Sequence, residues 1–323
     1  MIMPPTPSRF NHIVAFEVSK ASLVVHTLPA DRQQTIDNTP VAVRRLLRAE
    51  QRTNLKLGLG PMLMVCEATG GYERHVLEAA DAQGLALHRA HGSRTRMFAR
   101  FNGKLAKTDA IDARLIARYG LTIDLPLYTP PSPEQVALRQ LRQRRDEIGL
   151  MLRMEANRTE HATLKRLKTS LTRHQAWLKQ ELDAIETEIE DLIGNTPELH
   201  RKATLMRSLT GIGPHTVAAI LAYLPEIGTL SKATVAAISG LAPIAQDSGK
   251  HSGKRHIAGG RATLRASLYM AALVACYRNP TLRAFAQSLR ERGKPNKLIL
   301  TAVMRKLIVI LNAIVASGQP ART

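Results

Sequence analysis

The sequence has 323 residues, enough for two or three domains that each bury a hydrophobic core. Lys and Arg number 46 against 26 Asp and Glu, and the formal net charge of +20 indicates a polyanionic partner such as nucleic acid. Because residues 1–11 lack a signal peptide's apolar core and no apolar run approaches the ~18 residues that span a bilayer, we expect a cytoplasmic protein with no membrane anchor.

The first 127 residues predict one α/β domain. Residues 13–28 are β-prone on both sides of a turn near Lys20, and residues 61–66 form the continuous apolar run of a buried strand. A further strand is expected at 85–88, and helices are expected at 41–50, 72–83, 94–101 and 109–119. Because strands come first and then alternate with helices, the sheet is expected to be mixed.

Two carboxylates stand three residues apart in the predicted helix at 109–119. Positions i and i+3 share a face of a helix, so Asp109 and Asp112 could reach the same metal ion. Such pairs on a cationic protein suit Mg²⁺ and phosphodiester chemistry. Lys107 and Arg114 flank the pair and are expected to contact nucleic acid. The alternative is a solvated helix face on which Arg114 closes an ion pair.

Glu67 is a third candidate ligand, because it ends the predicted buried strand before a Gly-rich turn, where α/β sheets often place functional groups. It could instead cap the helix that follows. Glu17, at the end of the first strand, is the expected fourth ligand. Four carboxylates from two strands and one helix would form a ribonuclease-H-like site, in which two Mg²⁺ ions activate a nucleophile and stabilise the leaving oxygen.

A proline-rich joint at 126–133 separates the first domain from a long helical segment. Residues 134–195 carry a charged helical pattern that is basic in its first half and acidic near its end. This pattern indicates an antiparallel helical hairpin or coiled coil. The segment is either a solvated helix pair or a dimerising arm whose basic half lies on nucleic acid.

Residues 200–323 predict a second globular domain that is mostly helical. Within it, Gly211 and Gly213 precede an apolar helix at 217–224, which is the pattern of a helix-hairpin-helix. The backbone N–H groups at the start of such a helix suit a phosphate. The alternative is a plain connection between two helices.

A polar loop at 246–253 contains a candidate nucleophile, Ser248. A serine hydroxyl needs a base or a metal ion to help remove its proton, and neighbouring cations can neutralise charge on a phosphate. The flanking cations are Lys250, Lys254 and Arg255. The alternatives are a basic loop that only grips phosphates and Ser252 as the nucleophile.

Two arginines follow this loop, Arg261 and Arg265, and are expected to position phosphates or RNA rather than to read bases. A solvated face is the alternative for part of these cations. Further along, Tyr269, Met270 and Leu273 stand at helical spacing and are expected in the core.

Several motifs resemble those of the DEDD transposases of insertion sequences, which are related to the Piv-type DNA invertases. The N-terminal motifs are EATGGY at 67–72 and KTDAIDAR at 107–114. The C-terminal motifs are GLAP at 240–243, DSGK at 247–250, GRATLR at 260–265, AALV at 271–274 and MRKL at 304–307. The resemblance covers nearly the whole chain, with both motif sets in the family's order.

This resemblance implies a RuvC-like N-terminal domain, a coiled coil and a C-terminal transposase domain with a serine nucleophile. It places the carboxylates on Glu17, Glu67, Asp109 and Asp112, and the serine on Ser248. It further implies Mg²⁺, donor and target DNA, and a structured non-coding bridge RNA that selects the DNA sites. The family also implies a homo-oligomer, from dimer to tetramer, in which the serine of one protomer completes the carboxylate site of another.

One position departs from the family pattern, since Glu17 stands where the family has Asp. The extra methylene displaces the carboxylate, and Mg²⁺ demands near-ideal octahedral geometry. Two alternatives therefore accompany the expected site-specific DNA recombinase. One is a RuvC-like nuclease that uses metal-activated water, and the other is a catalytically inactive nucleic-acid-binding relative.

Overall fold

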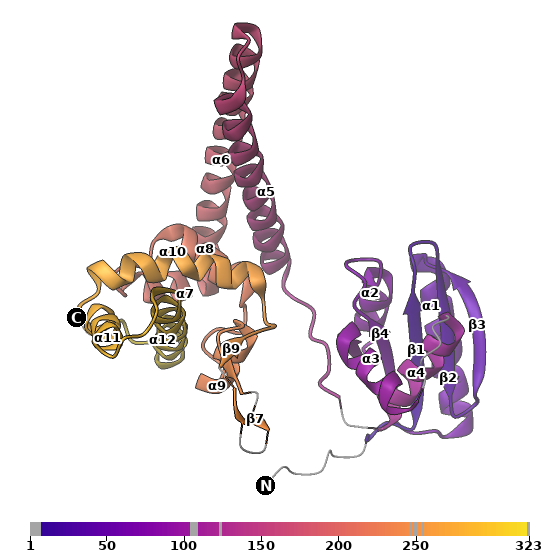
Figure 1. Cartoon of the computed structure of the whole chain (residues 1–323). Coiled ribbons are helices and arrows are strands. Elements are labelled where there is room, and N and C mark those ends of the chain that lie inside the picture. Colours follow the sequence, from indigo (N-terminus) through magenta and orange to yellow (C-terminus); the bar gives the residue numbers. More distant parts are fainter. Residues whose placement is uncertain are drawn as a thin grey trace. The chain divides into compact units, whose positions relative to one another are not determined.

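The computed structural model of the chain divides into two compact units, Met1–Pro130 and Pro131–Thr323 (Figure 1). The structure describes residues 8–103, 109–122, 125–245, 247–248, 251–253 and 255–321, without the side chains of residues 109–111, 248, 251 and 252. Three predicted nucleic-acid contacts, Lys107, Lys250 and Lys254, lie outside the described residues.

The first unit is built on a five-stranded mixed sheet. Its strands are β1 (His12–Val18), β2 (Ser22–Leu28), β3 (Arg32–Asp37), β4 (Met62–Glu67) and β5 (Ala86–Ala90), in the order β3-β2-β1-β4-β5. Neighbours β1–β2 and β2–β3 pair antiparallel, whereas β1–β4 and β4–β5 pair parallel. The expected mixed α/β sheet is therefore confirmed, and it is compatible with a ribonuclease-H-like domain.

Strand β3 was not predicted from the sequence. Its residues, RQQTID, are polar and mostly exposed at the edge of the sheet, so no apolar run marks it. Its backbone pairs along the whole length of β2, from Thr27 opposite Arg32 to Ser22 opposite Asp37. A polar edge strand of this kind protects the sheet from pairing with other chains.

Helices cover both faces of this sheet. α1 (Pro40–Leu57) and α2 (Arg74–Ala82) pack against the face that carries Val14 and Phe16. α4 (Asp109–Thr122) packs against the opposite face, which carries Ile13 and Ala15, and α3 (Gly92–Phe101) contributes Phe98 beside it. Helix α1 extends beyond the predicted 41–50, because its second half is polar and solvated and ends only at Gly58 in the left-handed conformation.

The second unit begins with a helical hairpin. α5 (Pro133–His161) and α6 (Lys165–Asn195) pack along each other and form the long antiparallel arm in Figure 1. A short break at residues 162–164 divides the predicted continuous pattern into these two helices. At the base of the arm, Leu138, Ile189 and Ile193 enter the hydrophobic core of the second unit.

The remainder of the second unit is mostly helical. Its helices are α7 (Pro197–Arg207), α8 (Pro214–Tyr223), α9 (Lys232–Ile238), α10 (Ala262–Arg278), α11 (Pro280–Glu291) and α12 (Asn296–Ser317). Two short antiparallel ladders lie between α9 and α10 in sequence. They pair β6 (Pro243–Ile244) with β9 (His256–Ile257), and β7 (Asp247–Ser248) with β8 (His251–Ser252).

Two apolar helices of this unit behave differently from the sequence-based expectation. α12 is long and apolar enough to cross a membrane by length and composition, but 56% of its apolar window is buried, as in a core helix. On α10 the expected core residues are wrong: Tyr269, Met270 and Leu273 are 49%, 59% and 37% exposed. Because α10 is apolar nearly all round, helical spacing alone did not indicate which face is buried.

Candidate active site

Two glutamates occupy adjacent positions at the ends of neighbouring parallel strands. Phe16 of β1 pairs with Cys66 of β4, so the next residues, Glu17 and Glu67, occupy adjacent positions on the two strands. Side chains alternate between the faces of a sheet, and both glutamates fall on the face that carries Ile13. The register of the sheet thus brings together two of the carboxylates that the sequence predicted.

Helix α4 covers this same face. A Cβ atom at Gly120 would lie only 2.7 Å from Cγ2 of Val65 and 3.2 Å from Cγ2 of Ile13, so the helix backbone lies directly on the sheet. Ile116 is buried in the same cluster. Asp112, Ile116 and Gly120 are spaced by four residues and therefore share one face of α4. Asp112 is thus on the side of the helix that faces the sheet.

The remaining predicted ligand, Asp109, is the first residue of α4, and its side chain is not among those described. Among the side chains that are described, no three Asp, Glu, His or Cys groups gather as a metal site. Glu17, Glu67 and Asp112 therefore share one face of the unit, but their side chains do not form such a group. Carboxylate oxygens are the donors that Mg²⁺ prefers, so the chemistry of these residues fits such an ion.

Arg114 forms an ion pair outside its own helix. Its guanidinium donates to Asp31, in the turn between β2 and β3, and Asp31 also lies 3.0 Å from Nε2 of the buried His26. This pair ties α4 to the sheet. The prediction that Arg114 contacts nucleic acid stays untested, but its guanidinium already has a partner within the unit.

The start of helix α3 holds the carboxylate of Glu67. Oγ1 of Thr95 donates a hydrogen bond of 2.9 Å to Oε2 of Glu67. On the other side, a Cβ atom at Gly92 would lie 2.3 Å from Oε1, so only glycine leaves room for the carboxylate there. The positive end of a helix favours a negative charge at this place. Glu67 is therefore both fixed by α3 and placed on the face that Glu17 shares.

Glu73 has a structural role that sequence reasoning missed. Its buried carboxylate accepts hydrogen bonds from the backbone N–H of Thr69 and Gly71, at 3.2 and 2.8 Å, and from Nε of Arg89 at 3.0 Å. Burial raises the pKa of Glu73, but these hydrogen bonds outweigh burial and hold the pKa at about 2. Glu73 thereby shapes the Gly-rich turn that follows Glu67. The signal available in the sequence was an acidic residue just after two glycines.

The predicted nucleophile lies in a short ladder of the second unit. Ser248 of β7 is paired with His251 of β8, and its side chain is outside the description. The neighbouring Asp247 accepts hydrogen bonds from the backbone N–H of Gly253 at 3.1 Å and from Nη1 of Arg255 at 2.7 Å. Arg255 thus helps to fold the loop that carries the serine. Its predicted contact with nucleic acid is untested.

Two other arginines that were predicted to contact phosphate form hydrogen bonds within the protein. Arg261 forms two hydrogen bonds of 2.8 and 2.7 Å with Glu226 and a third of 2.8 Å with the carbonyl of Tyr223. Arg265 donates to the carbonyl of Gly259 at 2.8 Å. These contacts support a structural role for both arginines, while their binding to nucleic acid stays a prediction.

The predicted helix-hairpin-helix corresponds to the turn between α7 and α8. Gly211 has a φ of +99°, and a Cβ atom there would lie 3.3 Å from Cα of Ala275 in α10, so glycine permits close packing of the turn. Gly213 is the N-cap of α8 and has an extended conformation. The packing on α10 supports the plain connection for Gly211, and phosphate binding at this turn is untested.

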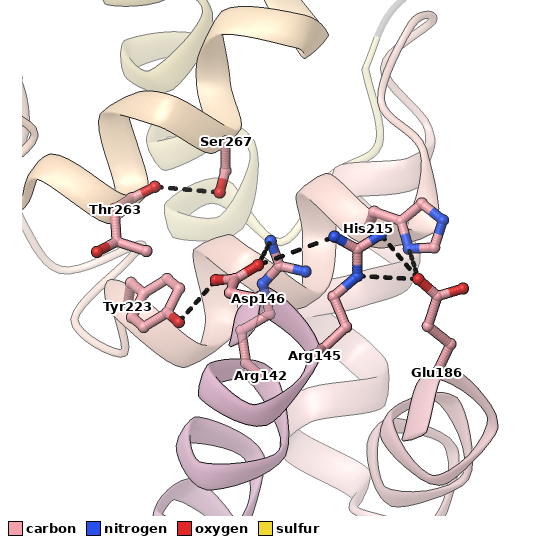
Figure 2. A network of polar contacts seen from close by, with 8 residues as sticks. All are labelled: Arg142, Arg145, Asp146, Glu186, His215, Tyr223, Thr263 and Ser267. Carbon is pink, nitrogen blue, oxygen red and sulfur yellow. Dashed lines mark hydrogen bonds and ion pairs between the residues drawn. The ribbon is translucent and has the colours of Figure 1, made fainter. Parts of the chain in front are cut away.

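A polar network joins the base of the hairpin to α8 (Figure 2). Asp146 of α5 accepts a hydrogen bond of 3.0 Å from the hydroxyl of Tyr223 and pairs at 3.0 Å with the buried Arg142. Arg145 pairs at 2.8 Å with Glu186 of α6. Burial, followed by Asp146, raises the pKa of Tyr223 to about 12, so its hydroxyl stays a donor. Arg142 and Arg145 belong to the basic half of the hairpin, but here they hold the fold together.

Comparison with known proteins agrees with both halves of this description. Residues 18–169 match a family model described as a transposase, of the DEDD type in the IS110 group. Residues 203–287 match a second model, described as the transposase IS116/IS110/IS902 family. The first match contains Glu67, Asp109 and Asp112 and part of the hairpin but begins one residue after Glu17, and the second match contains Ser248.

Individual proteins similar to this chain include gene-inverting and insertion-element proteins. The pilin gene-inverting protein of Moraxella lacunata is 30% identical over 263 residues, which is 80% of this chain and 81% of the relative, and the same figures hold for the protein of Moraxella bovis. An uncharacterized 42 kDa protein of insertion element IS900 from Mycobacterium paratuberculosis is 30% identical over 196 residues, 58% of this chain and 49% of the relative. The chain therefore belongs to the IS110 family of transposases, enzymes that recombine DNA by phosphoryl transfer.

Proposed function

We propose that the chain is a site-specific DNA recombinase of an insertion sequence, in which Ser248 bonds covalently to DNA and Glu17, Glu67, Asp109 and Asp112 hold Mg²⁺. The observation that supports this most directly is the level placement of Glu17 and Glu67 on parallel strands, beneath the helix that carries the two aspartates. An acidic pair of this kind on a protein with a net charge of +20 suits a metal-assisted reaction on a polyanion.

Members of this family typically depend on a divalent metal ion. When bound at the carboxylates, Mg²⁺ supplies stabilisation of the negative charge on the reacting phosphate and on the leaving oxygen. The residues of the chain do the positioning. Thr95 and the backbone of Gly92 hold the carboxylate of Glu67 in one orientation, so that little reorganisation is required during the reaction.

In the proposed step, Oγ of Ser248 attacks a DNA phosphorus, the new Oγ–P bond forms and the P–O3′ bond breaks. The hydroxyl proton of the serine passes to a base, and the leaving O3′ takes up a proton, which gives a 5′-phosphoserine ester and a free 3′ hydroxyl. One phosphodiester bond replaces another, so the reverse reaction with a different 3′ hydroxyl rejoins DNA. Arg255, close in sequence to the serine, would offset charge on the phosphate.

We further propose that a structured bridge RNA made by the element selects donor and target DNA, that the protein acts as a dimer to tetramer, and that it does so in the cytoplasm. The excess of 20 positive charges supports binding to two kinds of nucleic acid at once. Purification of the protein from cells that carry the element, followed by sequencing of bound RNA, tests the guide. A protein that recombines DNA equally well after ribonuclease treatment would contradict it.

A covalent protein–DNA adduct, mapped to one residue by mass spectrometry, tests the central proposal. We expect the adduct on Ser248, its loss in Ser248→Ala, and its retention in the matched control Ser252→Ala. Hydrolytic cleavage that survives in Ser248→Ala with Mg²⁺ would instead favour a nuclease that uses water. If neither the native protein nor Glu17→Asp cleaves or joins DNA, the chain is an inactive nucleic-acid-binding relative.

A further inference from the structure

The second unit contains a groove that the proposed chemistry does not use. It has a volume of about 1040 Å³ and lies between α9, β9, α11 and α12. The apolar part of its lining, which we call the floor, includes Leu241, Ile257, Phe285, Ala302 and Val309. A hollow of this size with an apolar floor has room for the flat faces of several small rings.

Positive charge surrounds this floor. The Lys and Arg residues of the lining are Lys232, Arg255, Lys297, Arg305 and Lys306, with His256 beside them, and no Asp or Glu is among the described residues of the lining. Nζ of Lys306 lies 4.3 Å from the ring centre of Phe285, and Arg255 pairs with Asp247. The other three charged side chains, Lys232, Lys297 and Arg305, form no ion pair with the described carboxylates. The groove is therefore a site for a polyanion.

The apolar floor selects among polyanions. A nucleic acid duplex keeps its bases stacked inside and presents sugars and phosphates, so the floor would meet only polar groups. An unpaired strand presents phosphates to the cations and base faces to the floor, which is how proteins bind single strands. Phe285, with Lys306 over its ring, is an aromatic side chain of the kind that bases stack on.

The lining also bears on the choice between DNA and RNA. Recognition of RNA uses hydrogen bonds to the 2′ hydroxyl. Thr301 is the one side-chain hydroxyl among the described lining residues, and its Oγ1 already donates to the carbonyl of Lys297 at 2.8 Å. No carboxylate is available there to accept a hydrogen bond from a 2′ hydroxyl. The described lining therefore gives no marked preference for RNA, and the choice of DNA rests on the neighbouring serine loop.

The groove is connected to the serine loop. His256 of β9 pairs with Ile244 of β6, and four residues further along the chain from Ile244 comes Ser248. We infer that the groove binds an unpaired DNA strand next to the phosphate that Ser248 attacks. This inference rests on the proposed function. The strand that the groove would bind is the one that separates from its partner strand when the recombinase cuts DNA.

Fluorescence anisotropy with an oligothymidine of about 12 nucleotides, a duplex of equal length and the matching oligouridine tests this inference. The test variant is Lys297→Gln/Arg305→Gln, and the matched control is Arg283→Gln/Arg290→Gln, on the side of α11 away from Phe285. We expect the test variant to bind oligothymidine roughly tenfold more weakly and to lower the slope of log affinity against log salt by about 1.4, while the control changes little.

A second variant and a crosslinking experiment separate a loss of binding from a loss of folding. Ala302→Glu places a negative charge on the floor and should also weaken oligothymidine binding roughly tenfold, with an unchanged melting curve as the folding check. In the native protein, a photoreactive uracil in the strand should crosslink to residues 296–309 or 255–257. An equal loss of duplex and single-strand binding, tighter binding of oligouridine, or crosslinks elsewhere would each overturn the inference.

The same measurements separate this inference from the proposed function. Ser248→Ala should keep the native affinity for oligothymidine, because the groove is intact. Strong single-strand binding without any covalent adduct would leave the groove in place and refute the serine mechanism. An adduct on Ser248 without single-strand preference would refute the groove alone.

Discussion

The two units hold their candidate site residues in opposite ways. In the first unit, Glu67 ends a paired strand, and its carboxylate is held by Thr95 and by the close backbone of Gly92. In the second unit, Ser248 belongs to a ladder of two residues on each side. A site on a regular sheet is defined by strand register, whereas a site in a loop depends on a few local contacts such as Asp247 with Arg255.

The two units also differ in the charge that they offer. The candidate carboxylate site of the first unit is acidic, and the groove of the second unit is lined by cations. An acidic site suits a metal ion, and a basic groove suits phosphates. The comparison therefore predicts that substitutions of the candidate carboxylates and of Ser248 abolish chemistry, while substitutions in the groove and in internal ion pairs change binding or stability.

The largest effect is expected for Glu67→Gln. The amide keeps a partner for Thr95 but loses the charge, so the site loses a ligand worth several kcal/mol, or roughly 10³-fold in rate. Recombination of a donor and a target plasmid measures the effect. The matched control is Glu78→Gln. The Glu78 side chain is 62% exposed and belongs to helix α2, outside the candidate carboxylate site. Equal activity of both variants would show that Glu67 only caps α3.

A smaller loss of activity is expected for Gly92→Ala. The new Cβ atom would lie 2.3 Å from Oε1 of Glu67, so the carboxylate must move from its position. Displacement of one ligand in this way costs roughly 10 to 100-fold in metal affinity or activity. Gly194→Ala in α6, with no atom within 4 Å of the new Cβ, is the control and should leave activity unchanged. Restored activity at high Mg²⁺ would support a positioning role, and unchanged activity would contradict it.

The sequence was sufficient to predict most of the first unit and the adjacent placement of two candidate ligands. Alternating and continuous apolar runs identify β1, β2, β4 and β5, and the parallel ladder then places Glu17 beside Glu67. It was insufficient for β3, whose polar residues depend on pairing with β2 rather than on burial. It also gave no sign that Gly92 touches Glu67, because that contact joins two elements that are distant in sequence.

The second unit was less predictable for a physical reason. Helices that are apolar nearly all round, such as α10, do not reveal their buried face, so Tyr269 and Met270 were assigned to the core although they are exposed. Basic residues were treated as one class, yet Arg142 and Arg261 are held by internal partners. Only packing decides which cations remain available for a polyanion.

A stability effect of about 2 to 3 kcal/mol is expected for Glu73→Gln, from the difference between its folded pKa of about 2 and an ordinary glutamate pKa of ~4.3. Because the folded pKa is the lower one, this stabilisation is complete above pH ~4.3 and is lost as the pH falls toward about 2. Chemical denaturation at several pH values measures it. Native protein and Glu73→Gln should converge in stability at low pH. A constant difference between them would mean that the carboxylate charge is not responsible.

The smallest effect is expected for Tyr223→Phe, which removes one hydrogen bond from the network at the base of the hairpin (Figure 2). Asp146 keeps Arg142 as a partner, so the loss should be about 1 kcal/mol in the free energy of unfolding. Because the pKa of Tyr223 is raised to about 12, the loss should be the same at pH 6 and pH 8. Tyr277→Phe, whose side chain is 67% exposed, is the control and should change nothing.

Recombination by Tyr223→Phe should stay within about twofold of native, since one such hydrogen bond stabilises the fold and touches no reacting group. A large loss of recombination at unchanged stability would show instead that the base of the hairpin takes part in the reaction, and its assignment to a purely structural role would then fail.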